Sequence, residues 1–88
     1  MRKPGGWMQL PTDERILEIL HTSGLVLSPA VIDKNIDKSR EQINRRLSVL
    51  TAYGLVTRVE RGYYEIAEDG IRYLAGELDA SELEADDE

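Results

Sequence analysis

The stretch DKSREQINRRLSVLTAYG, residues 37–54, carries the sequence marks of one complete helix. Ser39 is a preferred N-cap residue, and Gln42 stands three positions later, as in a capping box. Gly54 follows the last turn, where a glycine readily adopts the left-handed conformation that ends a helix. The apolar residues that recur at helical spacing are Ile43, Leu47 and Leu50. The pattern predicts a helix over residues 40–53, about 21 Å long, with one face packed on a core.

The opposite face of this predicted helix is polar, and its residues are Arg40, Glu41, Asn44, Arg45 and Ser48. None of these side chains has an evident role in a core. Arginine, asparagine and serine are side chains that contact base edges and phosphates in DNA complexes, and a helix of this length fits a major groove. The stretch alone is equally consistent with a surface helix whose polar face is solvated, so the neighbouring segments decide between the two interpretations.

Charge is distributed unevenly along the chain. The net charge of −6 includes seven acids and no base in residues 77–88, so residues 1–76 carry +1. Residues 34–61 hold seven cations and three acids, a net of +4. For nucleic-acid binding this local excess of cations matters more than the total charge.

Composition excludes several other classes of protein. A chain of 88 residues with 32% charged residues is expected to be one globular domain with a heavily charged surface. A single histidine, His21, and no cysteine leave little from which to build a metal site, a disulfide or a Ser-His-Asp triad. No apolar run approaches membrane-spanning length, and the N-terminus has no signal-peptide pattern. We expect a cytoplasmic protein with no cofactor, metal or evident small-molecule ligand.

The segments before residue 37 predict an arm and two helices. Residues 1–11 are expected to be a flexible arm whose apolar side chains Trp7, Met8 and Leu10 pack on the core or on a second copy. A helix capped by Thr12, with acids in its first turn, follows, and its core face holds Ile16, Leu17, Ile19 and Leu20. Ser28-Pro29 starts a short helix to about Asn35, expected to bury Val31 and Ile32, with Ala30 as a further candidate. A short helix, a turn and a longer helix form the layout of a helix-turn-helix.

After residue 54 the pattern changes from helical to β. Residues 55–60 and 63–66 are rich in β-forming side chains, and Gly62 suits a tight turn between them, so a hairpin is expected. Leu25–Leu27 is a candidate third strand at its edge. A last helix is predicted over residues 68–78, with a core face of Ile71, Leu74, Ala75 and Leu78. The acidic residues 79–88 are expected to be a disordered tail.

Three segments resemble a known family. They are LSPAVI at residues 27–32, SREQINRRL at 39–47 running on to YGLV at 53–56, and RGYYEI at 61–66 leading to Asp69-Gly70. Over residues 12–78 the chain is similar to winged helix-turn-helix regulators of halophilic archaea, the phage phi-H repressor-like group. The resemblance implies an α+β, mostly helical fold with a three-helix core, a β-hairpin wing and a C-terminal helix. It implies a DNA-binding transcriptional regulator, most simply a repressor, without enzymatic activity.

The composition also resembles that of proteins from concentrated salt, with three lysines, eight arginines and 17 acids. Because attraction to phosphate weakens as salt rises, such a protein is expected to depend on close hydrogen bonds and shape. The acidic tail then has two interpretations, as a competitor that covers the basic face or as solvated surface, and Leu83 would anchor it if it were packed.

Each candidate DNA-binding residue has an expected role. Ser39 and Arg40 are expected to meet phosphate at the start of the helix, and Lys38 belongs to the same group. Asn44 and Arg45 are expected to read adenine and guanine. Further candidates are Glu41, which either accepts from cytosine or pairs with Arg45, Ser48 at the fringe, and Arg58, Arg61, Gly62 and Tyr63 in the wing. Arg46 is expected to be structural and to lie over the hairpin, and Tyr53 and Tyr64 to belong to the core.

Two further points concern partners. One short helix reads only a few base pairs, so a homodimer is expected, formed through the arm or through Ile71, Leu74 and Leu78 of the last helix. The alternative function is a winged-helix protein-interaction module that does not touch DNA, which the net negative charge favours.

Overall fold

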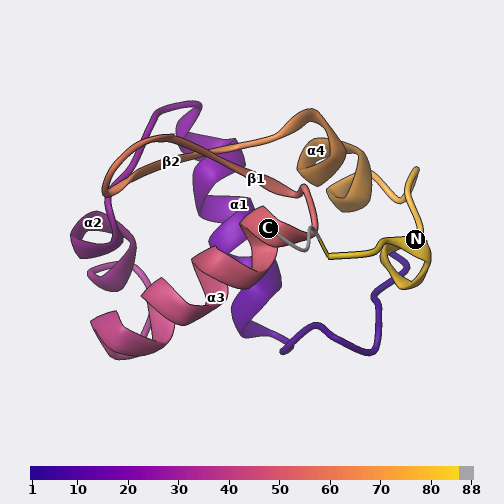
Figure 1. Cartoon of the computed structure of the whole chain (residues 1–88), viewed down its shortest axis with the longest axis horizontal. Helices are drawn as coiled ribbons and strands as arrows, with labels where there is room; N and C mark the ends of the chain where they lie inside the picture. The colour runs from indigo at the N-terminus through magenta and orange to yellow at the C-terminus, as the bar shows by residue number, and fades with distance from the viewer. Residues whose placement is uncertain (86–88) are drawn as a thin grey trace.

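The computed structural model describes residues 1–85, which form four α-helices, a two-stranded hairpin and one turn of 3-10 helix (Figure 1). In chain order the elements are α1 Thr12–Ser23, α2 Pro29–Asp33, α3 Arg40–Ala52, β1 Val56–Glu60, β2 Tyr63–Ile66, α4 Glu68–Leu74 and η1 Ala80–Glu82. Figure 1 shows α2 and the hairpin turn at one end of the molecule and α4, η1 and the N-terminal segment at the other. The fold class is α+β and mostly helical, and the helices and the hairpin follow one another in the predicted order.

One hydrophobic core joins these elements. Its members are Ile16, Leu17, Leu20, Ile32, Ile36, Ile43, Leu47, Leu50, Leu55, Val56, Tyr64, Tyr73 and Ala80. The predicted apolar faces of α1 and α3 both point into this cluster, with Ile19 partly buried at its edge. The helical spacing of the apolar residues therefore placed both helices in the correct rotation.

The first turn of α1 differs from the prediction. Thr12 is the first helical residue and is buried, and no side-chain hydrogen bond caps the helix, so the predicted cap is wrong. Asp13 and Glu14 lie in the first turn of α1, as predicted, but Asp13 is fully buried. Its Oδ2 accepts a hydrogen bond from the backbone N–H of Gln9 at 3.0 Å, which fixes the chain as it enters the helix.

The first helix of the helix-turn-helix is shorter than predicted. Pro29 begins α2, and the helix ends at Asp33, two residues before Asn35. Ile32 is completely buried, whereas Val31 is 43% exposed, so the predicted burial of Val31 is wrong. A helix of little more than one turn can direct only a few side chains to the core, and in α2 Ile32 occupies the inward position.

The second helix of the pair has the predicted ends to within one residue. Ser39 Oγ accepts from the backbone N–H of Gln42 at 3.2 Å, which confirms the N-cap of α3. The helix ends at Ala52, and Gly54 has a φ of +83°, a conformation that favours glycine. These local features define both ends of α3.

The hairpin pairs β1 with β2 antiparallel, and Gly62 has a φ of +84° in its turn. Leu27 lies against the free edge of β2. Its backbone N–H and carbonyl each form a 2.8 Å hydrogen bond with Tyr64. The third strand expected over residues 25–27 is therefore a single bridge, which ties the α1–α2 connection to the wing.

The last helix was predicted too long, and its predicted core face is only partly correct. It ends at Leu74, and its buried residues are Gly70 and Tyr73, while Ile71 is 39% exposed. A Cβ at position 70 would overlap the carbonyl oxygen of Leu55, so only glycine allows this close approach. Leu74 and Leu78 pack against the core as predicted, but the residue of α4 that fills the core is Tyr73, which was not in the predicted face.

A hydrogen bond joins the buried Tyr73 to α1. Its hydroxyl donates to Glu14 Oε2 at 2.6 Å. Burial raises the pKa of the Tyr73 phenol well above its ordinary value, and the bond to Glu14 raises it further. The phenol therefore stays neutral and acts as a donor.

The N-terminal segment is packed and is not the flexible arm that the sequence suggested. The Trp7 ring stacks on Tyr53 with centroids 3.7 Å apart and planes 2° apart, and its Nε1 donates to the carbonyl of Ala80 at 2.9 Å. Lys3 forms a parallel bridge with Asp79. The residue that remains exposed among the predicted apolar contacts is Leu10, at 48%.

The acidic C-terminal segment is also packed as far as residue 85. Ala80 is fully buried beneath the N-terminal segment, and Leu83 packs against the core. Hydrogen bonds from the hydroxyl and the N–H of Ser81 lower the pKa of Asp79. The prediction of a disordered tail is therefore wrong for residues 79–85, and residues 86–88 lie outside the described part of the chain.

Candidate nucleic-acid interface

The exposed face of α3 is the face that the sequence predicted. Arg40, Glu41, Asn44, Arg45 and Ser48 are all exposed. Arg45 Nη2 lies 3.8 Å from Glu41 Oε1, one helical turn away, with side chains 65% and 88% exposed. An exposed ion pair at this distance contributes little to stability, so Arg45 can exchange Glu41 for another acceptor at little cost. The structure thus contains the intrahelical pair that was one interpretation of Glu41.

Cations gather around the N-terminus of α3. Lys38 and Arg40 flank the cap residue Ser39, and all three are exposed. Arg40 Nη2 lies 3.6 Å from Asp33 Oδ2 of α2, and the Arg40 side chain is 58% exposed. Lys34, directly after α2, is also exposed and was not among the predicted candidates. The signal was present, because Lys34 is one of the cations in the basic stretch 34–61.

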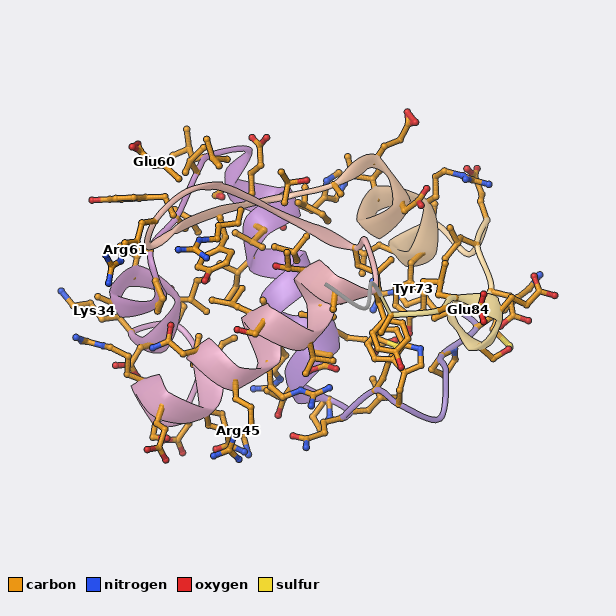
Figure 2. The ribbon with its side chains drawn as sticks, in the orientation of Figure 1. Lys34, Arg45, Glu60, Arg61, Tyr73 and Glu84 are labelled. Carbon is orange, nitrogen blue, oxygen red and sulfur yellow. The ribbon has the colours of Figure 1, made fainter. Side chains whose placement is uncertain are left out.

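The hairpin adds two exposed arginines, although it also carries the exposed acids Glu60 and Glu65. Arg58, Arg61 and Tyr63 are exposed, and Gly62 is half-buried between them. Figure 2 shows Arg61 and Lys34 at the same end of the molecule and Arg45 along the edge formed by α3, while Glu84 lies at the opposite end. The predicted candidates of helix and wing therefore belong to one side of the fold, away from the acidic segment.

Arg46 is structural, as expected, but its partner is not the hairpin. Its Nε and Nη2 each donate to an Asp13 carboxylate oxygen at 2.8 Å, and Nη2 also donates to the carbonyl of Trp7 at 3.3 Å. The Arg46 and Asp13 side chains are 7% and 0% exposed. The hydrogen bond to Asp13 raises the pKa of the Arg46 guanidinium despite its burial. This bidentate pair ties α3 to α1 directly behind the exposed Arg45.

The described residues, 1–85, contain no group of three or more His, Cys, Asp or Glu side chains placed to hold a metal ion. Within the same residues, no helix has both the length and the apolar character needed to cross a membrane.

The short helix α2, the capped helix α3 and the β-hairpin define a winged helix-turn-helix protein. The family described as winged helix-turn-helix phage repressor matches residues 1–86, and the chain belongs to this family. The repressor protein of Halobacterium phage phiH is 39% identical over 82 residues, which cover 89% of this chain and 91% of the phage protein. The crystal structure of the PhiH1 repressor-like protein from Haloarcula marismortui superposes with a TM-score of 0.87 at 37% identity, covering 97% of both chains.

These comparisons confirm both the resemblance and the fold class that the sequence predicted. The match extends beyond residues 12–78 into the N-terminal and C-terminal segments, in agreement with their packing on the core. Both relatives come from haloarchaea or their phage, which supports the halophilic source indicated by the composition. Repressors of this fold are regulatory proteins and are typically not enzymes.

Proposed function

We propose that the chain is a sequence-specific double-stranded DNA-binding transcriptional regulator that acts as a repressor in the cytoplasm. The observation that carries the proposal is the pair of faces on α3. One face is fixed to the core and to Asp13 through Arg46, and the other exposes Asn44 and Arg45 to solvent. The repressors in its family support the direction of regulation.

In this proposal α3 enters the major groove. Asn44 hydrogen-bonds an adenine edge, and Arg45 binds a guanine edge with two hydrogen bonds. Arg45 leaves its long contact with Glu41, and the freed carboxylate is placed to accept from a cytosine amine. Ser48 contacts the fringe of the site. These contacts supply sequence information, because each base pair presents a distinct pattern of donors and acceptors in this groove.

Contacts to the backbone fix the position of the helix. Ser39, Lys38 and Arg40 bind phosphate together with the free N–H groups at the start of α3. Arg40 exchanges its 3.6 Å contact with Asp33 for a phosphate oxygen. In the wing, Arg58, Arg61, Gly62 and Tyr63 bind the sugar-phosphate backbone beside the groove, a role that positions the protein without reading bases.

The direct test of the proposal is selection of bound duplexes from a random pool in concentrated potassium chloride. A regulator that reads bases at contact distance is expected to enrich one motif, because screening over about 3 Å at molar salt removes long-range attraction but not hydrogen bonds. Recovery of DNA without any shared sequence would contradict specific recognition.

The roles of helix and wing predict different specificity changes. Arg45→Ala is expected to lose about 1–3 kcal/mol of discrimination at one or two base positions, which changes the preferred sequence. Arg61→Ala is expected to weaken all sequences about equally and to reduce the salt dependence by about one phosphate contact. Affinities for a panel of single-base variants, measured for both mutants at several salt concentrations, separate the two outcomes. Identical specificity profiles would refute the division of roles.

A second function is supported by the net charge of −6, which opposes approach to DNA as a whole. In this alternative the winged helix is a protein-interaction module. Reversing two charges, Arg45→Glu with Arg61→Glu, is expected to abolish DNA binding under the main proposal, because each change replaces an attraction to phosphate or base with a repulsion. An unchanged DNA affinity would favour the interaction module.

The proposal includes a homodimer, since two copies double the length of DNA that one short helix can read. It requires no cofactor, metal or small-molecule ligand. The residues that the sequence predicted for the dimer contact are largely packed inside the chain, because Trp7 stacks on Tyr53 and Leu74 and Leu78 pack against the core.

A further inference from the structure

An ion pair crosses the turn of the helix-turn-helix. Arg40 is the first residue of α3, and its Nη2 lies 3.6 Å from Oδ2 of Asp33, the last residue of α2. Among the described residues, 1–85, no other ion pair joins these two helices. The Arg40 side chain is 58% exposed, whereas that of Asp33 is 30% exposed. The long cationic side chain can therefore turn to another partner, while the shorter, more covered carboxylate stays on α2.

The local structure of α2 does not explain an acid at this position. A carboxylate in the last turn of a helix lies at the negative end of the helix dipole, which is unfavourable. An exposed ion pair with a separation of 3.6 Å also adds little to stability. The position of Asp33 is better explained by its effect on Arg40.

The other cations proposed to bind the DNA backbone differ from Arg40. Lys38, Arg58 and Arg61 form no ion pair within the residues that the structure describes. When such a cation binds phosphate, the DNA releases the counterions that the phosphate held. Each contact of this kind weakens binding as salt rises, with a slope of about −0.9 in log affinity against log salt concentration.

We propose that Asp33 lowers the salt dependence of DNA binding, because it takes up a cation from solution when phosphate replaces it on Arg40. This role of Asp33 rests on the proposed function, in which Arg40 binds the DNA backbone. In the free protein the two side chains neutralise each other. In the complex, phosphate neutralises Arg40, and the Asp33 carboxylate is left beside an anionic backbone that concentrates cations around it. The cation that Asp33 gains offsets a cation that the DNA loses.

Glu41 forms a similar pair but does not share this role. Its Oε1 lies 3.8 Å from Nη2 of Arg45, and in the proposed function the freed carboxylate accepts from a cytosine amine. The new partner of Glu41 therefore depends on the base sequence. Asp33 loses its partner to a phosphate, which every duplex presents, so its effect is expected to be the same for all sequences.

The exchange suits binding in concentrated salt. A contact that releases cations loses affinity steadily as salt rises, whereas a contact that exchanges one ion pair for another keeps most of its affinity. The cost falls in dilute salt, where an arginine without a carboxylate partner would bind phosphate more tightly.

Affinity measured over about a tenfold range of potassium chloride concentration tests this role. The probes are a duplex that carries the selected motif and a random-sequence duplex of the same length. Asp33→Asn is expected to steepen the slope of log affinity against log salt by about 0.5–0.9 for both duplexes. Over that range the change corresponds to a relative gain in affinity of about three- to eightfold at the low-salt end. Asp33→Glu keeps a carboxylate on α2 and is expected to keep the original slope.

The matched control is Asp37→Asn. Asp37 is exposed in the same turn and forms no ion pair within residues 1–85, so its replacement removes an equal charge without freeing Arg40. It is expected to change the slope by less than half as much as Asp33→Asn. In an Arg40→Ala background, Asp33→Asn is expected to leave the slope unchanged, because no pair remains to be exchanged.

The arginines give a measurement that needs no change at Asp33. Arg61→Ala removes a cation that has no ion pair in the described structure and is expected to reduce the slope by about 0.9. Arg40→Ala is expected to reduce it by less than half of that amount, because its contact already exchanges one ion pair for another.

Circular dichroism over the same salt range verifies that each variant is folded. An unchanged slope in Asp33→Asn would overturn the role of Asp33, and so would equal slope reductions in Arg40→Ala and Arg61→Ala. Equal changes in Asp33→Asn and Asp37→Asn would also overturn it, since the effect would then be one of net charge. All three results would leave the proposed function intact. A protein that binds neither duplex would refute the proposed function, and the role of Asp33 with it.

Discussion

Replacing Arg46 by alanine is expected to lower the free energy of unfolding by about 3–5 kcal/mol, the largest loss that we predict for a single charged residue. Arg46 holds both oxygens of Asp13 at 2.8 Å, and the Asp13 side chain has no exposed surface. Removing the guanidinium leaves a buried carboxylate with the Gln9 N–H as its remaining hydrogen-bond donor. The Trp7 carbonyl also loses a donor, so the N-terminal segment should loosen with the helix pair.

The neighbouring arginine is the matched control. Arg45→Ala removes an equal charge from the same helix, but its contact with Glu41 is exposed and 3.8 Å long, so its loss should cost less than about 1 kcal/mol. Urea denaturation followed by circular dichroism compares the two variants. Equal stability of Arg45→Ala and Arg46→Ala would show that the buried ion pair with Asp13 does not stabilise the fold.

A double replacement separates the pair from the packing around it. Breaking a buried ion pair is costly because one charge is left alone, whereas replacing both partners by apolar side chains of similar volume is often neutral or stabilising. Asp13→Leu with Arg46→Met is therefore expected to be more stable than Arg46→Ala. An additive loss in the double variant would mean that each residue acts by itself.

The parts of the fold that the sequence predicted correctly are those with local signals. Ser39 caps α3 through a residue three positions away, and Gly54 and Gly62 have the positive φ that their turns require. The period of the apolar residues in α3 predicted which face of the helix packs on the core. The same period identified the opposite, exposed face, which carries Asn44 and Arg45. The candidate interface could be predicted because exposure follows from the helical period alone.

The errors come from contacts between distant residues. Asp13 and Arg46 are 33 residues apart, and an acid in a first turn has a sufficient local explanation, so its burial had no signal. Tyr73 is fully buried on α4, although Ile71 and Leu74 gave an equally plausible apolar face. The N-terminal segment appeared flexible because Pro4, Gly5 and Gly6 lack periodicity. Its order comes from Trp7, which reaches both Tyr53 and the carbonyl of Ala80.

Leu47→Ala is expected to cost about 2–5 kcal/mol, because Leu47 has no exposed surface and lies at the centre of the inner face of α3. Its side chain fills space between α3 and the rest of the core, and truncation leaves a cavity that a fixed helix cannot close. For a domain of this size the loss corresponds to a fall in melting temperature of at least about 8 °C.

Ser48→Ala is the control for this change, since it alters the next residue on the exposed face and should stay within about 0.5 kcal/mol of the unaltered protein. The two variants also separate stability from recognition. Leu47→Ala should bind less DNA only in proportion to its unfolded fraction, so cooling or stabilising salt should restore binding with the original sequence preference. Ser48→Ala should keep the melting temperature and change the affinity slightly at the edge of the site. A melting curve for Leu47→Ala that matched the unaltered protein would mean that α3 is rotated, and that the face assigned to DNA is not the face presented to solvent.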